Sequence, residues 1–331
     1  MRVGVIGGAG FIGSHVVDKL LEAGHDVTVF DIMRPHRPDV RHVVADILDA
    51  SRTTVALAGR YDALYLLAAV SDVNDVLHIP VESAQVNIMA VAHVLEAARR
   101  TGAGRVILAS TTWVYALAEP EEVDEDTPLH LDRVNHVYTA SKLSAEMLCH
   151  AYHTLYGVDM TILRYGIPYG PRARLGTVLA NFVAKALKGE PITIHGDGRQ
   201  WRSLVAVEDL ALGNVAALQN VAKNQTYNLD GPERVEIRRI AENVRQHFPD
   251  VAIQYVDGRP GDLPPKIVSS RKALAHLGWK PHVDFEEGAN RYVRWVEENA
   301  MSGRPPRSVI DAPPDGARMA SRHRSARSAR S

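Results

Sequence analysis

The chain has 331 residues, of which 46% are hydrophobic and 23% charged. This length allows one large domain or two coupled ones, each with its own core, so size does not exclude an enzyme. The 38 lysines and arginines balance 39 aspartates and glutamates, so the charge gives no reason to expect binding to nucleic acid or to an anionic membrane.

The single cysteine, Cys149, excludes intrachain disulfides and a multi-cysteine metal site. It suits a reducing compartment, and we expect it to be a buried small hydrophobic residue. Met1 leads directly into an apolar run without a charged leader, and no apolar run is long enough to span a bilayer. These features predict a cytoplasmic location.

Short apolar runs rich in valine and isoleucine recur along the first half of the chain and predict strands. Helical patterns lie between most of them; in the first, Ile12, Val16 and Leu20 are four residues apart and line one face. Continuously apolar strands that alternate with amphipathic helices predict an α/β fold with a doubly wound parallel sheet, the Rossmann type. The runs cover residues 3–6, 27–30, 42–45, 63–70, 106–109 and 160–163.

The pattern changes after about residue 165, where a loop rich in glycine and proline is followed by shorter and more mixed elements. We expect residues 1–165 to form the Rossmann domain, with a later return segment near 203–228. Residues 166–301 then form a smaller C-terminal α/β domain that binds substrate. Residues 302–331 mix serine, proline and arginine without periodicity, which predicts a disordered tail.

Three glycines, Gly7, Gly10 and Gly13, follow the first predicted strand and open the first predicted helix. Glycine permits a tight turn and a close approach of the backbone to a phosphate, and a helix N-terminus offers free N–H groups. This context predicts a site for the pyrophosphate of a dinucleotide, with an ordinary glycine-rich turn as the alternative.

Asp31 ends the second predicted strand. A carboxylate at this point can accept both ribose hydroxyls of NAD and repel a 2′-phosphate, which favours NAD over NADP. Arg34 and Arg37, just beyond, could instead accommodate that phosphate. Asp46, at the end of the third predicted strand, could accept the adenine amino group or cap the following helix.

Tyr138 and Lys142 are four residues apart in a helical pattern, so both side chains point the same way. A phenol ionises near pH ~10, but a lysine ammonium and an oxidised nicotinamide would both favour the phenolate. Ser110 and Thr111 end the fifth predicted strand, at the edge where the nicotinamide would lie. We predict Thr111, Tyr138 and Lys142 as the catalytic residues, with a surface Tyr/Lys pair as the alternative.

These motifs, in this order, resemble the extended short-chain dehydrogenase/reductase family, and within it the NAD-dependent nucleotide-sugar epimerases and dehydratases of the UDP-glucose 4-epimerase type. The resemblance covers about residues 1–300 and extends to the blocks 195–198, 207–211 and 259–262. It implies a set of residues that bind NAD: Gly7, Gly10, Phe11, Ile12, Gly13, Asp31, Asp46, Ile47, Leu67, Ala68, Ala69, Asn87, Ser110, Tyr138, Lys142 and Tyr165. It also implies a set that binds substrate: Ser71, Thr111, Tyr138, Arg202, Arg259 and Lys266.

Arg202 and Arg259 would bind the diphosphate and ribose of a nucleoside diphosphate sugar, for which the planar guanidinium is suited. The alternative for both is a surface salt bridge. Lys266 could pair with a carboxylated sugar such as a uronate, or could be a solvated lysine. No metal is expected, because His150 and His153 have no third ligand nearby in the sequence.

The resemblance implies that Tyr138 takes a proton from a sugar hydroxyl, usually at C4, while hydride passes to NAD. Relatives that dehydrate or decarboxylate usually carry an acid just after the Ser/Thr, where this chain has Thr112 and Trp113. This favours a 4-epimerase, with a UDP-sugar as its first-choice substrate. The alternatives are a nucleotide-sugar dehydratase, decarboxylase or 4-ketoreductase, and a non-catalytic NAD-sensing or scaffold protein.

Two helical patterns, at residues 81–100 and 138–156, carry wide apolar faces. In relatives the equivalent pair forms a four-helix interface between two copies, so the resemblance implies a homodimer. Packing within one chain could use the same faces.

Overall fold

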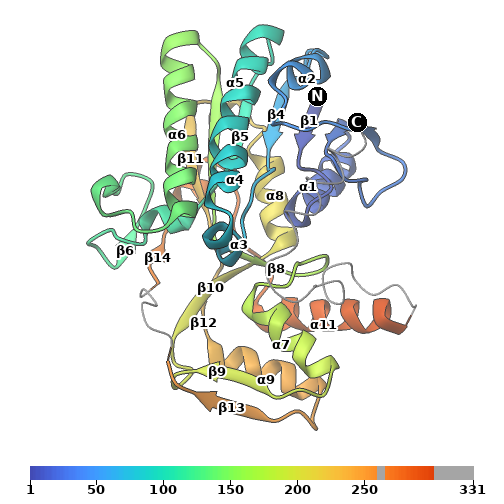
Figure 1. The fold of residues 1–331 in the computed structure, drawn as a ribbon, viewed down its shortest axis with the longest axis vertical. Coiled ribbons are helices and arrows are strands. Elements are labelled where there is room, and N and C mark those ends of the chain that lie inside the picture. Colours follow the sequence, from blue (N-terminus) through green and yellow to red (C-terminus); the bar gives the residue numbers. More distant parts are fainter. Residues whose placement is uncertain (259–264, 302–331) are drawn as a thin grey trace.

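The computed structural model describes residues 1–258 and 265–301. Its centre is a seven-stranded sheet in the order β3-β2-β1-β4-β5-β7-β11, and all its neighbouring strands are parallel (Figure 1). The strands are β1 (Arg2–Ile6), β2 (Asp26–Phe30), β3 (Arg41–Val43), β4 (Ala63–Leu66), β5 (Val106–Thr111), β7 (Met160–Tyr165) and β11 (Gln225–Leu229). The predicted doubly wound Rossmann fold is confirmed.

Helices cover both faces of this sheet because successive side chains of each strand point to opposite sides. Tyr65 on β4 enters the core beneath α1 and α8, whereas its neighbours Leu64 and Leu66 enter the core beneath α5 and α6. Cys149 lies in this second core and is buried, as predicted. The helices around the sheet are α1 (Phe11–Glu22), α2 (Ala50–Ala56), α3 (Val73–His78), α4 (Pro80–Ala84), α5 (Ala90–Thr101), α6 (Val137–Tyr156), α8 (Val207–Ala216) and α10 (Arg271–Leu277).

A second group of elements lies beyond the carboxyl ends of the central strands, in the lower part of Figure 1. It has its own apolar core, to which Phe182, Ile240 and Tyr292 contribute. The helices are α7 (Val178–Leu187), α9 (Ile237–His247) and α11 (Phe285–Met301). Its two small sheets are β12 (Arg234–Glu236), β10 (Trp201–Ala206) and β8 (Ile167–Tyr169) in that order, and β13 (Ile253–Val256) beside β9 (Ile192–His195).

The segment between β5 and α6 forms a flap that the sequence did not reveal. It contains two 3₁₀ turns (Thr112–Tyr115 and Leu131–Arg133) and the short strand β6 (Glu122–Val123). β6 pairs in parallel with β14 (Ile267–Val268), which precedes α10. The flap therefore joins the start of α6 to the C-terminal part of the chain.

Candidate active site

The glycine-rich turn packs closely against neighbouring backbone, which is possible only because Gly7 and Gly13 have no side chains. Gly7 has φ +88°, and a Cβ on it would lie 2.5 Å from the backbone nitrogen of Ala68. A Cβ on Gly13 would lie 2.1 Å from the carbonyl oxygen of Gly7. Gly10 is the N-cap of α1 and supplies no side-chain cap, so the first-turn N–H groups are available to an anion. This cradle fits the pyrophosphate of a dinucleotide.

Asp31 follows β2 and lies against this turn. Its Oδ2 accepts a hydrogen bond from Ala9 N at 2.9 Å, and its Oδ1 accepts one from Met33 N at 2.9 Å. Arg37 does not offer an open phosphate site, because its guanidinium pairs with Asp39 at 2.6 Å and Asp18 at 3.6 Å. These pairs favour NAD over NADP.

Asp46 does not cap α2, so that alternative is wrong. The N-cap of α2 is Asp49, whose side chain accepts from Arg52 N. Asp46 Oδ1 instead accepts from Leu48 N at 3.0 Å and shapes the turn before the helix. The next residue, Ile47, holds α5 through its carbonyl oxygen, which lies 2.9 Å from His93 Nδ1. Contact of Asp46 and Ile47 with adenine stays a prediction.

The loop after β4 passes beside the glycine-rich turn with half-buried Leu67, Ala68 and Ala69. Asn87 fixes this loop, since its amide exchanges two hydrogen bonds with the backbone of Val70 and donates a third to Ser141 Oγ. Asn87 thus points into the protein from a π-helical turn (Gln85–Met89) between α4 and α5. Asn87 therefore supports the loop beside the glycine-rich turn, and its contact with NAD stays a prediction.

Thr111, Tyr138 and Lys142 come together at the carboxyl edge of the sheet. Thr111 is the last residue of β5, and Tyr138 and Lys142 lie on the first turns of α6. The Thr111 side chain is hydrogen-bonded to Tyr138, and Lys142 Nζ lies 5.9 Å from the Tyr138 ring centre. Lys142 Nζ also donates to the carbonyl oxygen of Ala109 at 3.0 Å. The predicted catalytic residues thus form one cluster.

The pKa values in this cluster differ from the sequence-based expectation. Burial raises the pKa of Tyr138 to about 12, against the opposing hydrogen bond from Thr111. Burial lowers the pKa of Lys142 to about 8, against the opposing charge of Glu146. Lys142 therefore does not lower the pKa of the phenol by itself. With the cofactor bound, the Lys142 ammonium and the positive charge of an oxidised nicotinamide would favour the phenolate together.

Two aromatic side chains stand beside Tyr138. The Trp113 ring meets the Tyr138 ring edge to face at 6.4 Å and the His136 ring at 6.1 Å. His136 is the N-cap of α6, and its Nδ1 accepts from Tyr138 N at 3.1 Å. Trp113 is 38% exposed, so its indole forms part of the wall next to the phenol.

Two predicted cofactor residues direct their side chains away from the cradle. Ser110 donates its hydroxyl to Glu146 Oε1, and Tyr165 donates its hydroxyl to Asn214 Oδ1 at 2.6 Å. Both side chains are buried. These contacts give both side chains a structural role, and contact of Ser110 and Tyr165 with NAD stays a prediction. Glu146 was not among the site residues predicted from the sequence. Its position one helical turn beyond Lys142, and so on the same face of α6, is the signal that could have identified it.

The predicted substrate residues lie in different surroundings. Ser71 is exposed beyond the β4 loop, and Arg202 is half-buried with Nη1 donating to the carbonyl oxygen of Trp201 at 2.8 Å. Lys266 Nζ donates to the carbonyl oxygen of Pro120 on the flap at 3.1 Å. Lys266 is therefore not fully solvated, and its pairing with a sugar carboxylate stays a prediction. Arg259 and the predicted tail at 302–331 lie outside the described residues.

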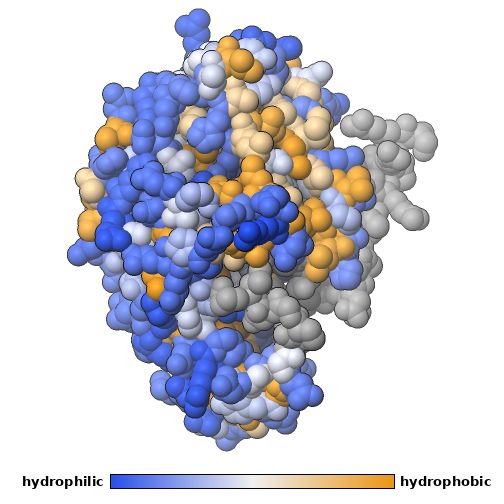
Figure 2. Space-filling model, turned by 90° about the vertical axis from the view of Figure 1, so that its left-hand side faces the viewer, coloured by the Kyte–Doolittle hydropathy of each residue, from blue (hydrophilic) through white to orange (hydrophobic). Residues whose placement is uncertain are grey.

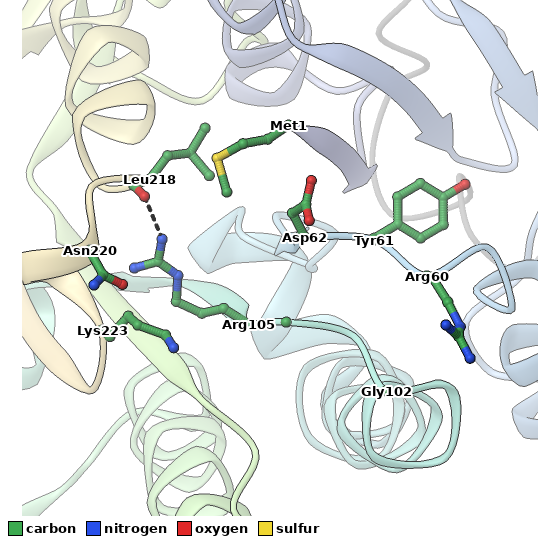
Figure 3. Close-up of a pocket in the computed structure, with 10 residues that line it drawn as sticks. Met1, Arg60, Tyr61, Asp62, Gly102, Arg105, Leu218, Asn220 and Lys223 are labelled. Atoms are coloured by element: carbon green, nitrogen blue, oxygen red, sulfur yellow. Dashed lines mark hydrogen bonds between the residues drawn. The ribbon is translucent and has the colours of Figure 1, made fainter.

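A cavity of about 340 Å³ opens at the opposite, amino edge of the sheet (Figure 3). Two of its three basic side chains, Arg105 and Lys223, are bound by the chain itself. Arg105 donates to the carbonyl oxygen of Leu218 at 2.7 Å, and Lys223 pairs with Asp159 at 2.6 Å. Catalytic groups lie at the other end of the strands, so this cavity is not the active site. It is lined by Met1, Arg60, Tyr61, Asp62, Gly102, Gly104, Arg105, Leu218, Asn220 and Lys223.

Comparison with known proteins agrees with this geometry. The model of the NAD dependent epimerase/dehydratase family matches residues 3–230. UDP-glucuronic acid decarboxylase 1 of Xenopus tropicalis is 31% identical over 312 residues, covering 90% of this chain and 72% of that protein.

Two solved structures also match. UDP-glucose 4-epimerase of Thermotoga maritima, solved with UDP-glucose, has a TM-score of 0.82 and 29% identity, covering 91% of this chain and 100% of that one. The dTDP-glucose 4,6-dehydratase DesIV of Streptomyces venezuelae, solved with NAD, has a TM-score of 0.83 and 29% identity, covering 91% and 98%.

The chain belongs to the NAD dependent epimerase/dehydratase family. Its cofactor is NAD, as the glycine cradle, Asp31 and the family indicate. Within residues 1–258 and 265–301, no helix is long and apolar enough to cross a membrane. The same residues contain no group of three or more histidine, cysteine or acidic side chains that could hold a metal ion.

Proposed function

We propose that this chain is an NAD-dependent nucleotide-sugar 4-epimerase, with a UDP-sugar as substrate. The observation that carries the proposal is the cluster of Thr111, Tyr138 and Lys142 at the carboxyl edge of the sheet, with Trp113 beside the phenol. Ser71, Arg202 and Arg259 are proposed to bind the nucleotide sugar. The expected limits of the two domains, at residues 165 and 301, belong to the same proposal.

The cluster supports oxidation at C4 followed by reduction on the other face. Bound NAD would supply the hydride acceptor, and Tyr138 would take the proton of the C4 hydroxyl as the C4 hydride leaves, which would give a 4-keto sugar. The ring then presents its other face, the hydride returns to C4, and the phenol gives its proton back. Thr111 supplies a hydroxyl that binds the same oxygen, and Lys142 holds the nicotinamide ribose. No cofactor is consumed over the cycle.

The surroundings of Tyr138 favour epimerisation over elimination. Its aromatic neighbours are Trp113 and His136, and burial together with the Thr111 hydrogen bond accounts for the pKa of the phenol. The positions at which dehydrating and decarboxylating relatives usually carry an acid are here Thr112 and Trp113, and neither a hydroxyl nor an indole acts as a carboxylate base. The 4-keto sugar would therefore keep its C5 proton.

A second candidate is a nucleotide-sugar decarboxylase. The similarity to UDP-glucuronic acid decarboxylase 1 covers 90% of the chain and favours it. Fold and overall similarity do not transmit the reaction outcome, which depends on particular side chains. We place epimerisation first because of Trp113.

We also propose that two copies associate through the face formed by α4, α5 and α6. Figure 2 shows hydrophobic residues gathered on the side of the molecule that carries α6. The exposed apolar side chains there include Val81, Met89, Met147 and Leu155. Contiguous exposed apolar surface is typical of an interface. A cytoplasmic location is part of the same proposal.

Product analysis tests the proposed reaction. Purified protein is incubated with UDP-sugars and, separately, TDP-sugars, and the products are followed by NMR and mass spectrometry. Epimerisation conserves mass and interconverts the C4 epimers, whereas dehydration loses water, decarboxylation loses carbon dioxide and net reduction consumes NADH. Absence of interconversion with every sugar would contradict the proposal. Full retention of activity and phenotype in Y138F would instead favour a non-catalytic NAD sensor.

A further inference from the structure

The start of α6 is bound to the end of β5 by three successive side-chain links. Residues four apart on a helix project from the same face, and here three of them meet three consecutive residues of the strand. The spacing makes Glu146 the third member of a series whose first two members are catalytic. The pairs are Tyr138 with Thr111, Lys142 with the carbonyl of Ala109, and Glu146 with Ser110.

Glu146 is itself held from the far side by Arg164 on β7. The guanidinium donates to both carboxylate oxygens, from Nη2 at 2.7 Å and from Nε at 3.0 Å. Arg164 also donates to Tyr115 Oη, which donates in turn to Asn228 Oδ1 at 2.9 Å. Glu146 is 4% exposed and Arg164 6%. The carboxylate therefore has a fixed position and no access to bulk water.

A buried ion pair of this kind is costly to form and is weak support for stability by itself. Its position suggests a different use, since the negative charge stands one helical turn from the Lys142 ammonium. We propose that Glu146 is a positioning residue of the active site, whose fixed carboxylate keeps Lys142 in its ammonium form despite burial. The inference rests on the proposed function only in assigning Lys142 to the catalytic cluster.

Electrostatics around Lys142 agree with this role. Burial lowers the pKa of Lys142 to about 8, and the charge of Glu146 opposes that fall. From β5, the carbonyl oxygen of Ala109 accepts from Lys142, whereas the hydroxyls of Ser110 and Thr111 bind Glu146 and Tyr138. Without Glu146, the buried amine would lose its proton at a lower pH and could no longer favour a phenolate. The other titratable groups around this network are Tyr138 and Cys149 on α6, Arg164 on β7 and Tyr115 on the first 3₁₀ turn.

The direct test is a titration of Lys142 without any sugar. The full-length protein is labelled with ¹³Cε-lysine, the Lys142 signal is assigned with K142M, and its shift is followed by NMR against pH. In E146Q the pKa of Lys142 should fall by about one unit. The matched control is E96Q, which breaks a surface pair with Arg99 and Arg100 and should leave the titration unchanged. An unchanged pKa in E146Q would overturn the proposal.

Activity gives a second readout that a purely structural role would not move. In E146Q the alkaline limb of the kcat profile should shift to lower pH by the same amount, with little change in KM for the sugar. Loss of thermal stability with an unshifted profile would contradict the proposal. If E146Q fails to fold because Arg164 is left unpaired, E146Q/R164Q removes both charges and should shift the titration in the same direction.

The proposed function and the proposed role of Glu146 can be contradicted separately. If the wild-type protein converts no nucleotide sugar, the proposed function is wrong, but the titration of Lys142 can still be measured. If the protein is a fully active epimerase but the pKa of Lys142 is the same in wild type and E146Q, the inference about Glu146 is wrong.

Discussion

Lys142 at the carboxyl edge of the central sheet and Arg105 at its amino edge are both buried, but the two basic side chains have different roles. At the carboxyl edge, Lys142 is 6% exposed and, within the described part of the chain, its ammonium makes one hydrogen bond, to Ala109. At the amino edge, Arg105 is 4% exposed and donates to the carbonyls of Leu218 and Gln219, just after α8. A guanidinium that satisfies carbonyls near a helix C-terminus is a structural clamp.

The comparison of Lys142 with Arg105 shows what distinguishes a functional buried cation from a structural one. Burial lowers the pKa of both side chains, so burial alone does not distinguish them. What differs is the number of hydrogen bonds that hold each cation, since among the described residues Arg105 makes three and Lys142 makes one. The other difference is the surroundings, because Lys142 lies beside Tyr138 and Arg105 lines a cavity away from the catalytic cluster.

The largest expected effect is on activity in K142M. Loss of the ammonium removes both the ribose contact and the positive charge beside Tyr138, so kcat should fall by about 10²–10⁴-fold. The melting temperature should not fall, because the substitution also removes the free-energy cost of burying the Lys142 charge. Steady-state kinetics and calorimetry check the two halves of this prediction. A near-normal kcat in K142M would contradict the functional role of Lys142 and so its difference from Arg105.

The converse effect is expected for R105M. The carbonyl oxygens of Leu218 and Gln219 would lose their donor, and unfolding by urea should show a loss of about 2–3 kcal/mol. Turnover should be unchanged, because no catalytic group contacts Arg105. Arg60 lines the same cavity and is exposed, so R60M serves as the control and should change neither quantity. A selective loss of turnover in R105M would give the amino edge a role in function.

A smaller effect is expected in the pH dependence of stability. Because burial lowers the pKa of Lys142 to about 8, the folded chain binds fewer protons than the unfolded chain between that pH and the ordinary lysine pKa of ~10.4. This contribution makes the free energy of unfolding rise with pH across the window. Urea unfolding at about pH 7.5 and about pH 9.5 should show a larger rise in wild type than in K142M. Equal slopes would contradict the assignment.

The smallest effect is expected for K266A. Lys266 Nζ contacts the flap through the carbonyl of Pro120, so its loss should alter neither turnover nor the preference between neutral and carboxylated sugars. Competition between UDP-glucose and UDP-glucuronate measures this preference. A drop confined to the uronate would restore the role that the sequence first suggested for this lysine.

The sequence predicted the central sheet well because its strands are continuously apolar and its helices strongly periodic. The predicted strand at 106–109 extends to Thr111 in the structure, since two buried hydroxyl residues complete it. The single helix expected over 81–100 instead contains a π-helical turn from Gln85 to Met89, which apolar spacing does not reveal.

Side-chain directions in the site could not be predicted in the same way. Asn87 turns to Val70 and Ser141, and Tyr165 turns to Asn214, through contacts between residues far apart in the sequence. The pairing of β6 with β14 joins two-residue strands across the chain, too short for any periodicity. Local patterns place residues on an edge of the sheet, whereas long-range packing decides which of them face the ligand.

The most direct test of the central claim is the absorbance of reduced nicotinamide in the enzyme with NAD bound, mixed with a UDP-sugar. The account predicts a transient, enzyme-bound NADH signal that decays as the C4 epimer forms, and no signal in Y138F. An NAD-loaded wild-type protein that gives no such signal with any UDP- or TDP-sugar would contradict it.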